Sequence, residues 1–325
     1  MAASPVDAIS KAVERSKQLL FPFKAEKWFA LGFTVFMAQC GEAREGGSFN
    51  LPTGLPSGPS GSGGLGGGAS PAAEIQQLIE EAIRALQANL SLYVVLAATG
   101  AFLVLAIALF VNWFSSRAKL MFVESVVWDR VDVSAQWSRA AELGMSLFKF
   151  RLALGLIGGV LGLSAVAAAV VAGLPDFRTG ELLGTRALIA YAIFAGSWLF
   201  IGLPLAITSW LLEDFVVPLM VVRNQRVLEA WRACRAEVIP GNIGGIIVFY
   251  LLRFVLRFAT LIVISIIGCV TCCLVYIPYI GTVMLLPIWV FDRAYSLYYL
   301  EQLGIPIFPA PEPAWVAYDQ WRFPR

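Results

Sequence analysis

The chain has 325 residues, of which 58% are hydrophobic and 14% are charged, and its formal net charge is +2. An average soluble domain carries about 25% charged residues, so a soluble protein with this little charge could not cover its surface. The composition indicates a protein whose solvent is lipid, and the small net charge gives no argument for a nucleic-acid partner.

Histidine is absent from the sequence. Its absence excludes Ser-His-Asp and Cys-His catalysis, zinc bound by histidine and haem held by histidine. The five cysteines do not form the two C-x-x-C pairs of a zinc finger. We therefore expect a protein that is not an enzyme, with no catalytic residue, no cofactor and no metal.

The N-terminal segment, residues 1–27, mixes polar and apolar residues before the first apolar run. In a cleaved signal peptide the apolar run directly follows a short basic region. We interpret 1–27 as a retained cytoplasmic segment and Trp28 as the start of an anchor.

Apolar stretches suited to crossing a membrane recur along residues 28–300, which we interpret as one membrane domain. The first stretch is short, and Pro204 predicts a kink in the fourth. The predicted fold is an all-α integral membrane bundle with six spans, at residues 28–40, 90–114, 152–174, 187–212, 243–268 and 281–300.

Lysine and arginine are unevenly distributed among the connecting segments. They are frequent in 1–27, 115–151 and 213–242, and scarce in 41–89 and 175–186. Because basic loops remain on the cytoplasmic side of a membrane, we expect both termini in the cytoplasm.

Two segments have compositions unlike a span. Residues 41–72 are rich in Gly, Ser and Pro and predict a flexible outer loop, followed by an amphipathic helix at the outer surface. Residues 301–325 are rich in Pro and aromatic residues and cannot form a long helix. This cytoplasmic tail is expected to lie on the surface, to dock in a partner's groove, or to be disordered.

One unit occurs twice, at about 115–174 and 213–268. Each copy opens with Phe-Val, has a tryptophan 15 or 16 residues later, and leads through a basic amphipathic stretch into a glycine-containing span. We predict an internal duplication whose amphipathic helices lie among anionic headgroups, or alternatively cover the cytoplasmic ends of the spans as soluble helices. The expected interfacial anchors are Trp137, Trp231, Arg226 and Arg232.

The spans after both amphipathic stretches contain small residues at four-residue spacing. Gly155, Gly158, Gly159 and Gly162 form two overlapping pairs, and Gly241 with Gly245 forms a third. Small residues allow helix backbones to approach closely, so this pattern favours packing within the chain, with a homodimer face as the alternative.

Three stretches resemble a group of bacterial polytopic membrane proteins of unknown function. They are LLFPFKAEKWFALGF (19–33), VVPLMVVRNQRVLEAW (216–231) and PYIGTVMLLPIWVFDRAYSLYYLEQLG (278–304). That group includes the membrane domain fused to some glycerophosphodiester phosphodiesterases. The resemblance implies a helical bundle in a bacterial inner membrane. It brings no activity, because the phosphodiesterase would need a further soluble barrel with metal-binding carboxylates and histidines.

Charged residues inside the predicted spans are the sharpest signal. Such a residue costs ~2.5 kcal/mol or more near the bilayer centre, so it usually pairs or faces water. Arg253 and Asp292 lie at similar depths, roughly 16 and 13 Å along their helices from the cytoplasmic ends. We predict that Asp292 pairs with Arg253 or Arg257, with Glu213, Asp214 and Arg293 nearby. The cluster is either a structural pair that fixes helix packing or a polar cavity for a lipid headgroup or an anionic solute.

Cysteines gather in the stretch GCVTCCLVYIPYIG, residues 268–281, which is expected on the outer side. Its apolar neighbours disfavour a reactive thiolate. Inert thiols, a disulfide among Cys40, Cys269, Cys272 and Cys273, and redox or metal chemistry remain as alternatives.

These observations favour a non-enzymatic multi-pass protein of the bacterial inner membrane, an envelope scaffold that contacts anionic lipid. The alternative is a transporter or lipid-handling protein with a polar site between spans four to six, since many transporters are built from repeats. The expected partners are anionic lipid headgroups, a second copy of the chain, and a protein bound by the tail.

Overall fold

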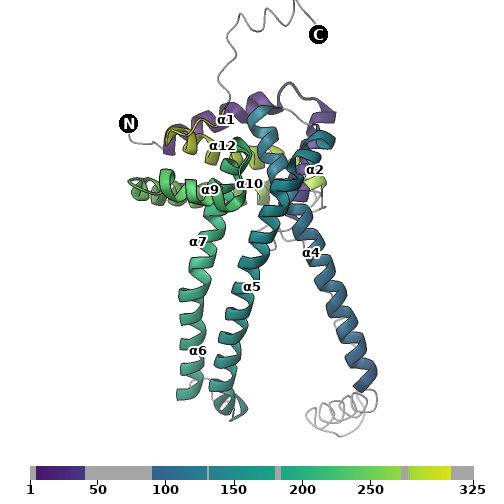
Figure 1. The fold of residues 1–325 in the computed structure, drawn as a ribbon, viewed down its shortest axis with the longest axis vertical. Helices are drawn as coiled ribbons and strands as arrows, with labels where there is room; N and C mark the ends of the chain where they lie inside the picture. The colour runs from purple at the N-terminus through teal and green to yellow at the C-terminus, as the bar shows by residue number, and fades with distance from the viewer. Residues whose placement is uncertain are drawn as a thin grey trace, which may run out of the picture.

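A computed structural model describes residues 5–40, 90–129, 132–179, 184–271, 277 and 279–308, and the regular elements among them are helical. Three long helices stand beside one another and meet a group of shorter helices at one end (Figure 1). We call the long ones the upright helices. They are α4 (Leu90–Trp128), α5 (Val133–Thr179), and the continuous run of α6 (Thr185–Ser197), η1 (Trp198–Gly202), α7 (Leu203–Leu211), η2 (Leu212–Val216) and α8 (Val217–Arg223).

Each upright helix is longer than a bilayer is thick. The three contain 39, 47 and 39 residues. At 1.5 Å per residue they extend roughly 58–70 Å, whereas the hydrocarbon core of a bilayer is about 30 Å thick. Only part of each helix can therefore lie in lipid.

Side-chain exposure changes along each upright helix and divides it in two. The apolar side chains of 94–110, 152–174 and 185–211 are largely exposed, whereas 115–128, 133–151 and 212–223 contribute many buried positions. The predicted span ends at Phe114, Leu152 and Leu212 coincide with these changes. We call the buried end the helical layer, which comprises the described residues of 5–40, 115–151 and 212–308.

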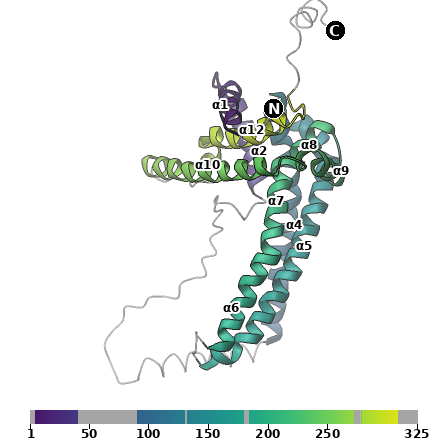
Figure 2. The same ribbon diagram turned by 90° about the vertical axis from the view of Figure 1, so that its left-hand side faces the viewer.

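Within the part of the chain that the structure describes, four helices are long and apolar enough to cross a membrane, namely the three upright helices and α10 (Ile243–Val270). However, α10 runs across the upright helices rather than along them (Figure 2). The structure thus places the predicted fifth span in a different direction from spans two to four.

The predicted first and sixth spans form shorter helices within the helical layer. The first corresponds to α2 (Ala25–Gln39), which has 15 residues and packs beside the layer end of α4. The sixth is divided at Leu285 into α11 (Ile280–Met284) and α12 (Leu286–Gln302). Pro287 lies in the first turn of α12, where its missing N–H is tolerated. The structure therefore does not confirm the six predicted spans.

Among the described residues, three π-helical segments each end two residues before a proline. η1 precedes Pro204, η2 precedes Pro218, and η3 (Cys234–Val238) precedes Pro240. The ring of a proline clashes with the carbonyl four residues earlier, and a wider π turn moves that carbonyl away. The third upright helix therefore continues through two prolines without ending.

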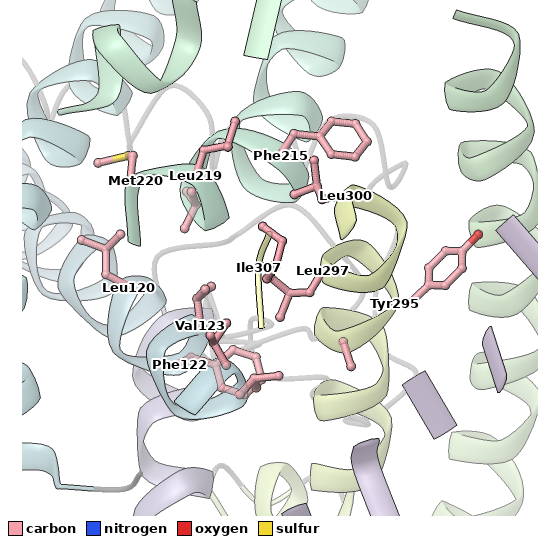
Figure 3. Packing of buried hydrophobic residues seen from close by; sticks show 14 of the residues in the cluster. Leu120, Phe122, Val123, Phe215, Leu219, Met220, Tyr295, Leu297, Leu300 and Ile307 are labelled. Carbon is pink, nitrogen blue, oxygen red and sulfur yellow. The ribbon is translucent and has the colours of Figure 1, made fainter. Parts of the chain in front are cut away.

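The core of the helical layer lies where the end of α4, the η2–α8 segment and α12 meet (Figure 3). Helix α12 is central, since eight of its residues are buried. Helix α1 (Pro5–Leu20) covers it with an amphipathic face in which Ala8, Ala12, Ser16 and Leu19 are buried at helical spacing. The labelled core side chains are Leu120, Phe122, Val123, Phe215, Leu219, Met220, Tyr295, Leu297, Leu300 and Ile307.

The two copies of the predicted repeat follow different paths. In the first, the amphipathic stretch and the following span form one continuous helix, α5. In the second, α9 (Val227–Ala233) and η3 are separated from α10 by a turn at Pro240, where Gly241 has a φ of +76°. A positive φ is readily available only to glycine, so this turn redirects the chain where the first copy continues straight.

Candidate functional site

Arg253 of α10 lies between two carboxylates in the helical layer. The residue is only 7% exposed. Its Nη1 forms an ion pair with Asp214 Oδ1 of η2, and its Nη2 donates a hydrogen bond of 2.6 Å to Asp292 Oδ2 of α12. The structure thus contains the predicted pairing of Asp292 with Arg253, and it adds Asp214 as a second partner.

Glu213 extends this network to α4. Its carboxylate forms an ion pair with the buried Lys119, and its backbone carbonyl accepts a hydrogen bond of 2.8 Å from Arg293 Nη1. The guanidinium of Arg293 also lies over the ring of Phe122, 5.9 Å from its centroid. Lys119 was missed by the sequence reasoning, although a lysine that interrupts an apolar run of a helix is itself a signal of a buried partner.

Aromatic stacking holds α10 on α12 next to the ion pairs. The ring of Phe249 lies between those of Tyr295 and Tyr299, with centroids 4.8 and 4.6 Å away. Phe249 precedes Arg253 by four residues, so the two side chains share one face of α10. Gly245, one turn earlier, allows Tyr299 to approach, because a Cβ there would lie 2.8 Å from its hydroxyl oxygen.

The charges of the cluster are nearly balanced. It contains four cations, Lys119, Arg253, Arg257 and Arg293, and three carboxylates, Glu213, Asp214 and Asp292. Burial alone would raise the pKa of Asp292, but the nearby guanidinium groups of Arg253 and Arg257 lower it below its ordinary value. A network in which buried charges are mutually paired is suited to fixing helix positions, and breaking it by removing one partner is costly.

The predicted depths of Arg253 and Asp292 assumed that the fifth and sixth segments cross the bilayer side by side with the other spans. In the structure α10 crosses the upright helices, and α12 lies inside the helical layer (Figure 2). The predicted pairing of Asp292 with Arg253 is present, and it lies within the helical layer.

The comparison with protein families assigns the chain to one group. Residues 3–308 match a Family of unknown function (DUF7544). The chain belongs to this family. No curated protein and no solved structure matches the chain. The DUF7544 match covers both the upright helices and the helical layer, and it shows no link to the membrane domain of the glycerophosphodiester phosphodiesterases. It indicates neither an enzymatic activity nor its absence.

The predicted interfacial tryptophans of this DUF7544 protein are half-buried against other rings. Trp137 packs on Phe114 with centroids 4.9 Å apart, and Arg117 lies over its ring. Trp231 packs against Phe150. These contacts support the alternative in which the amphipathic stretches cover the ends of the spans.

The predicted interfacial arginines remain at the surface. Arg226 Nη2 lies 2.6 Å from Glu142 Oε1, and both side chains are largely exposed, while Arg232 is exposed on α9. Surface ion pairs contribute little to stability, so the contact between Arg226 and Glu142 is a weak one.

The predicted disulfide remains a prediction. Cys40 and Cys269 carry free thiols, and Cys272 and Cys273 lie outside the described residues. The fifth cysteine, Cys234, is buried in η3, and burial raises its pKa to about 11. Among the described residues, no three His, Cys, Asp or Glu side chains are grouped as metal ligands would be.

Proposed function

We propose that this DUF7544 protein is a non-enzymatic, multi-pass protein of the bacterial inner membrane and acts as an envelope scaffold. The lower parts of the upright helices cross the bilayer, and the helical layer lies on the cytoplasmic face against anionic headgroups. Because α2 ends in the layer and α4 begins at the opposite end (Figure 2), this placement requires the chain to cross once more between these two helices. The observation that carries the proposal is the change from exposed apolar to buried side chains at Phe114, Leu152 and Leu212, one in each upright helix. Such a change is expected where helices leave lipid and enter protein.

The orientation is supported by the basic residues of the helical layer. Exposed cations occur there on several elements, whereas the opposite end of the upright helices offers Arg186 near the start of α6. Basic segments next to spans remain in the cytoplasm and attract anionic lipid. The exposed cations of the layer include Lys11, Lys17, Lys24, Arg139, Arg232 and Arg235.

Helix α10 is proposed to lie in the plane of the membrane surface. One face carries Phe249 and Arg253, which pack on the layer. The opposite face exposes a stripe of apolar side chains at helical spacing, Ile247, Leu251, Phe254, Phe258 and Leu261. An in-plane helix of this kind inserts its apolar face between headgroups and acyl chains.

The transporter alternative depends on the cluster around Arg253. A transport site needs charges that an ion or solute can reach. Here Arg253 and Asp214 are buried and paired with each other, and Glu213 is bound by Lys119. This arrangement favours a structural role for the cluster and therefore the scaffold.

Single-cysteine labelling of intact cells tests the membrane placement. In a background in which the native cysteines are serine, Thr185→Cys reports the far end of the upright helices and Gln18→Cys reports the layer; both positions are exposed. A membrane-impermeant maleimide should label Thr185→Cys in intact cells and Gln18→Cys only after lysis. Labelling of both from outside would refute the placement.

The direction of α10 is tested by the same reagent on native Cys269, retained as the sole cysteine. Cys269 is exposed near the end of α10. If α10 lies in the plane, Cys269 reacts only after lysis, like Gln18→Cys. If α10 crosses the bilayer, Cys269 reacts in intact cells, and the in-plane assignment is wrong.

A further inference from the structure

A groove of about 620 Å³ runs between α5 and the third upright helix. This volume is in the range of sites that bind small organic molecules, roughly 300–1,000 Å³. Glycines of α5 form one wall, and Phe194 and Trp198 contribute to the other. Its polar end contains Asn112, Arg151, Ser209 and Glu213, so the groove is apolar along its length and polar at one end.

The glycines of α5 keep the groove open rather than bringing two helices together. A Cβ at Gly155, Gly159 or Gly162 would meet no other atom within 4 Å. Only at Gly158 would it meet a neighbour closely, 2.9 Å from Leu205 Cδ1. Close packing of helices therefore accounts for Gly158, whereas Gly155, Gly159 and Gly162 line the open space of the groove.

The polar end of the groove lies where the upright helices enter the helical layer. Asn112, Arg151 and Glu213 come from three different upright helices, each within two residues of the change in exposure. In the proposed membrane placement this is the level of the headgroups. From Arg151 to Val166 the wall of α5 is roughly 22 Å long, which accommodates an acyl chain of one leaflet of a core about 30 Å thick.

The charge at this end suits a phosphate. The carboxylate of Glu213 is engaged by Lys119, so its charge is compensated within the protein. Arg151 lines this end of the groove, and a guanidinium presents paired N–H donors that match phosphate oxygens. The hydroxyl of Ser209, which also lines this end, donates a hydrogen bond to the carbonyl of Leu205.

We infer that this groove binds one anionic phospholipid, with an acyl chain along Gly155, Gly159 and Gly162 and the phosphate at Arg151. The inference rests on the proposed membrane placement. The two fail in different experiments, because cysteine labelling reports which compartment a residue faces, whereas lipid retention reports what occupies the groove.

Native mass spectrometry of the full-length protein tests the occupant. The detergent-solubilised protein is incubated with phosphatidylglycerol or with diacylglycerol of the same chains. The wild type should retain one phosphatidylglycerol and at least tenfold less diacylglycerol. Glycerol phosphate alone should not compete, because the acyl chain fills most of the groove. Equal retention of diacylglycerol, or displacement by glycerol phosphate, would overturn the assignment.

Matched variants locate the bound lipid. Gly159→Leu places a side chain in the groove at a position where a Cβ meets no atom within 4 Å, and it should lower phosphatidylglycerol retention at least tenfold, as should Gly155→Leu. The control is Gly100→Leu on α4, where a Cβ also meets no atom within 4 Å and which lies outside the groove. Arg151→Gln should lower retention of phosphatidylglycerol but not of diacylglycerol, whereas Lys149→Gln, exposed two residues earlier, should change neither.

Gel filtration and circular dichroism establish that each variant is folded before lipid is added. Retention by folded Gly159→Leu and Gly155→Leu equal to that of Gly100→Leu would exclude the groove as the lipid site. A lipid-free wild-type dimer that Gly159→Leu dissociates would likewise overturn the inference, because the occupant would then be a second copy of the chain.

Discussion

Replacing Arg253 with methionine should be among the most destabilising single changes in the helical layer. Met keeps the apolar stem of the side chain but removes the charge that Asp214 and Asp292 share. Asp214 is only 4% exposed, so the variant leaves a buried carboxylate without its main partner. Removing one partner of a buried ion pair costs about 3–5 kcal/mol, and we expect a loss of that size.

Asp292→Asn should cost less. The side chain of Asp292 is 33% exposed, and Arg253 retains Asp214 in this variant. We expect a loss of about 1.5–3 kcal/mol, the range for a hydrogen bond to a charged group. Arg235→Met serves as a control, because Arg235 is exposed on η3, and it should change stability by less than about 0.5 kcal/mol.

The assay is reversible unfolding by sodium dodecyl sulfate in mixed micelles, followed by circular dichroism. A double-mutant cycle separates the ion pair from lost packing. Arg253→Met combined with Asp214→Leu should be more stable than Arg253→Met alone, because the unpaired carboxylate is gone. If Arg253→Met unfolds like the wild type, or if the two changes are simply additive, the claim that this pair holds α10 to η2 is wrong.

Three further outcomes are expected. The pKa of Asp292 is lowered in the folded protein, so its contribution to the free energy of unfolding is present above the ordinary value of 3.8 and is lost as the pH falls through the lowered pKa. The stability of Asp292→Asn, measured by thermal melts, should therefore fall less steeply from about pH 5 to pH 3 than that of the wild type. Because the pKa of Cys234 is raised to about 11, the folded wild type in detergent should react with iodoacetamide at pH 8 at the exposed Cys269 well before Cys234, and equal rates by peptide mapping would contradict the buried position of η3. Gly32→Ala should lower the free energy of unfolding in dodecyl sulfate by about 1–3 kcal/mol, because its Cβ would lie 2.6 Å from Val283 Cγ2. Gly100→Ala, on the open face of α4, should not lower it.

The upright helices could be predicted from the sequence because bilayer thickness sets the length of an apolar run. The predicted ends at Phe114, Leu152 and Leu212 lie where exposure changes, since charged and aromatic residues begin there. The full lengths of α4 and α5 could not be predicted, because their continuations are amphipathic and belong to the core of the layer. There, packing rather than hydropathy decides where a helix ends.

The direction of α10 could not be read from its composition. A 28-residue apolar helix satisfies every criterion for a span, whether it crosses the bilayer or lies along it. What decides its direction is contacts between residues far apart in sequence, such as Phe249 with Tyr299 and Arg253 with Asp214. The arginines within α10 were the available signal, and they predicted a partner correctly but not where in the fold that partner lies.

The polar cluster and the groove are connected through Glu213. Glu213 lines the polar end of the groove, while Lys119 binds its carboxylate and Arg293 its backbone carbonyl. η2 also supplies Asp214 to Arg253, so the same π-helical turn contributes one acidic residue to each feature. If the ion pairs fix η2, then Arg253→Met should weaken phosphatidylglycerol retention although Arg253 does not line the groove. Unchanged retention in folded Arg253→Met would mean that the groove keeps its shape without the cluster.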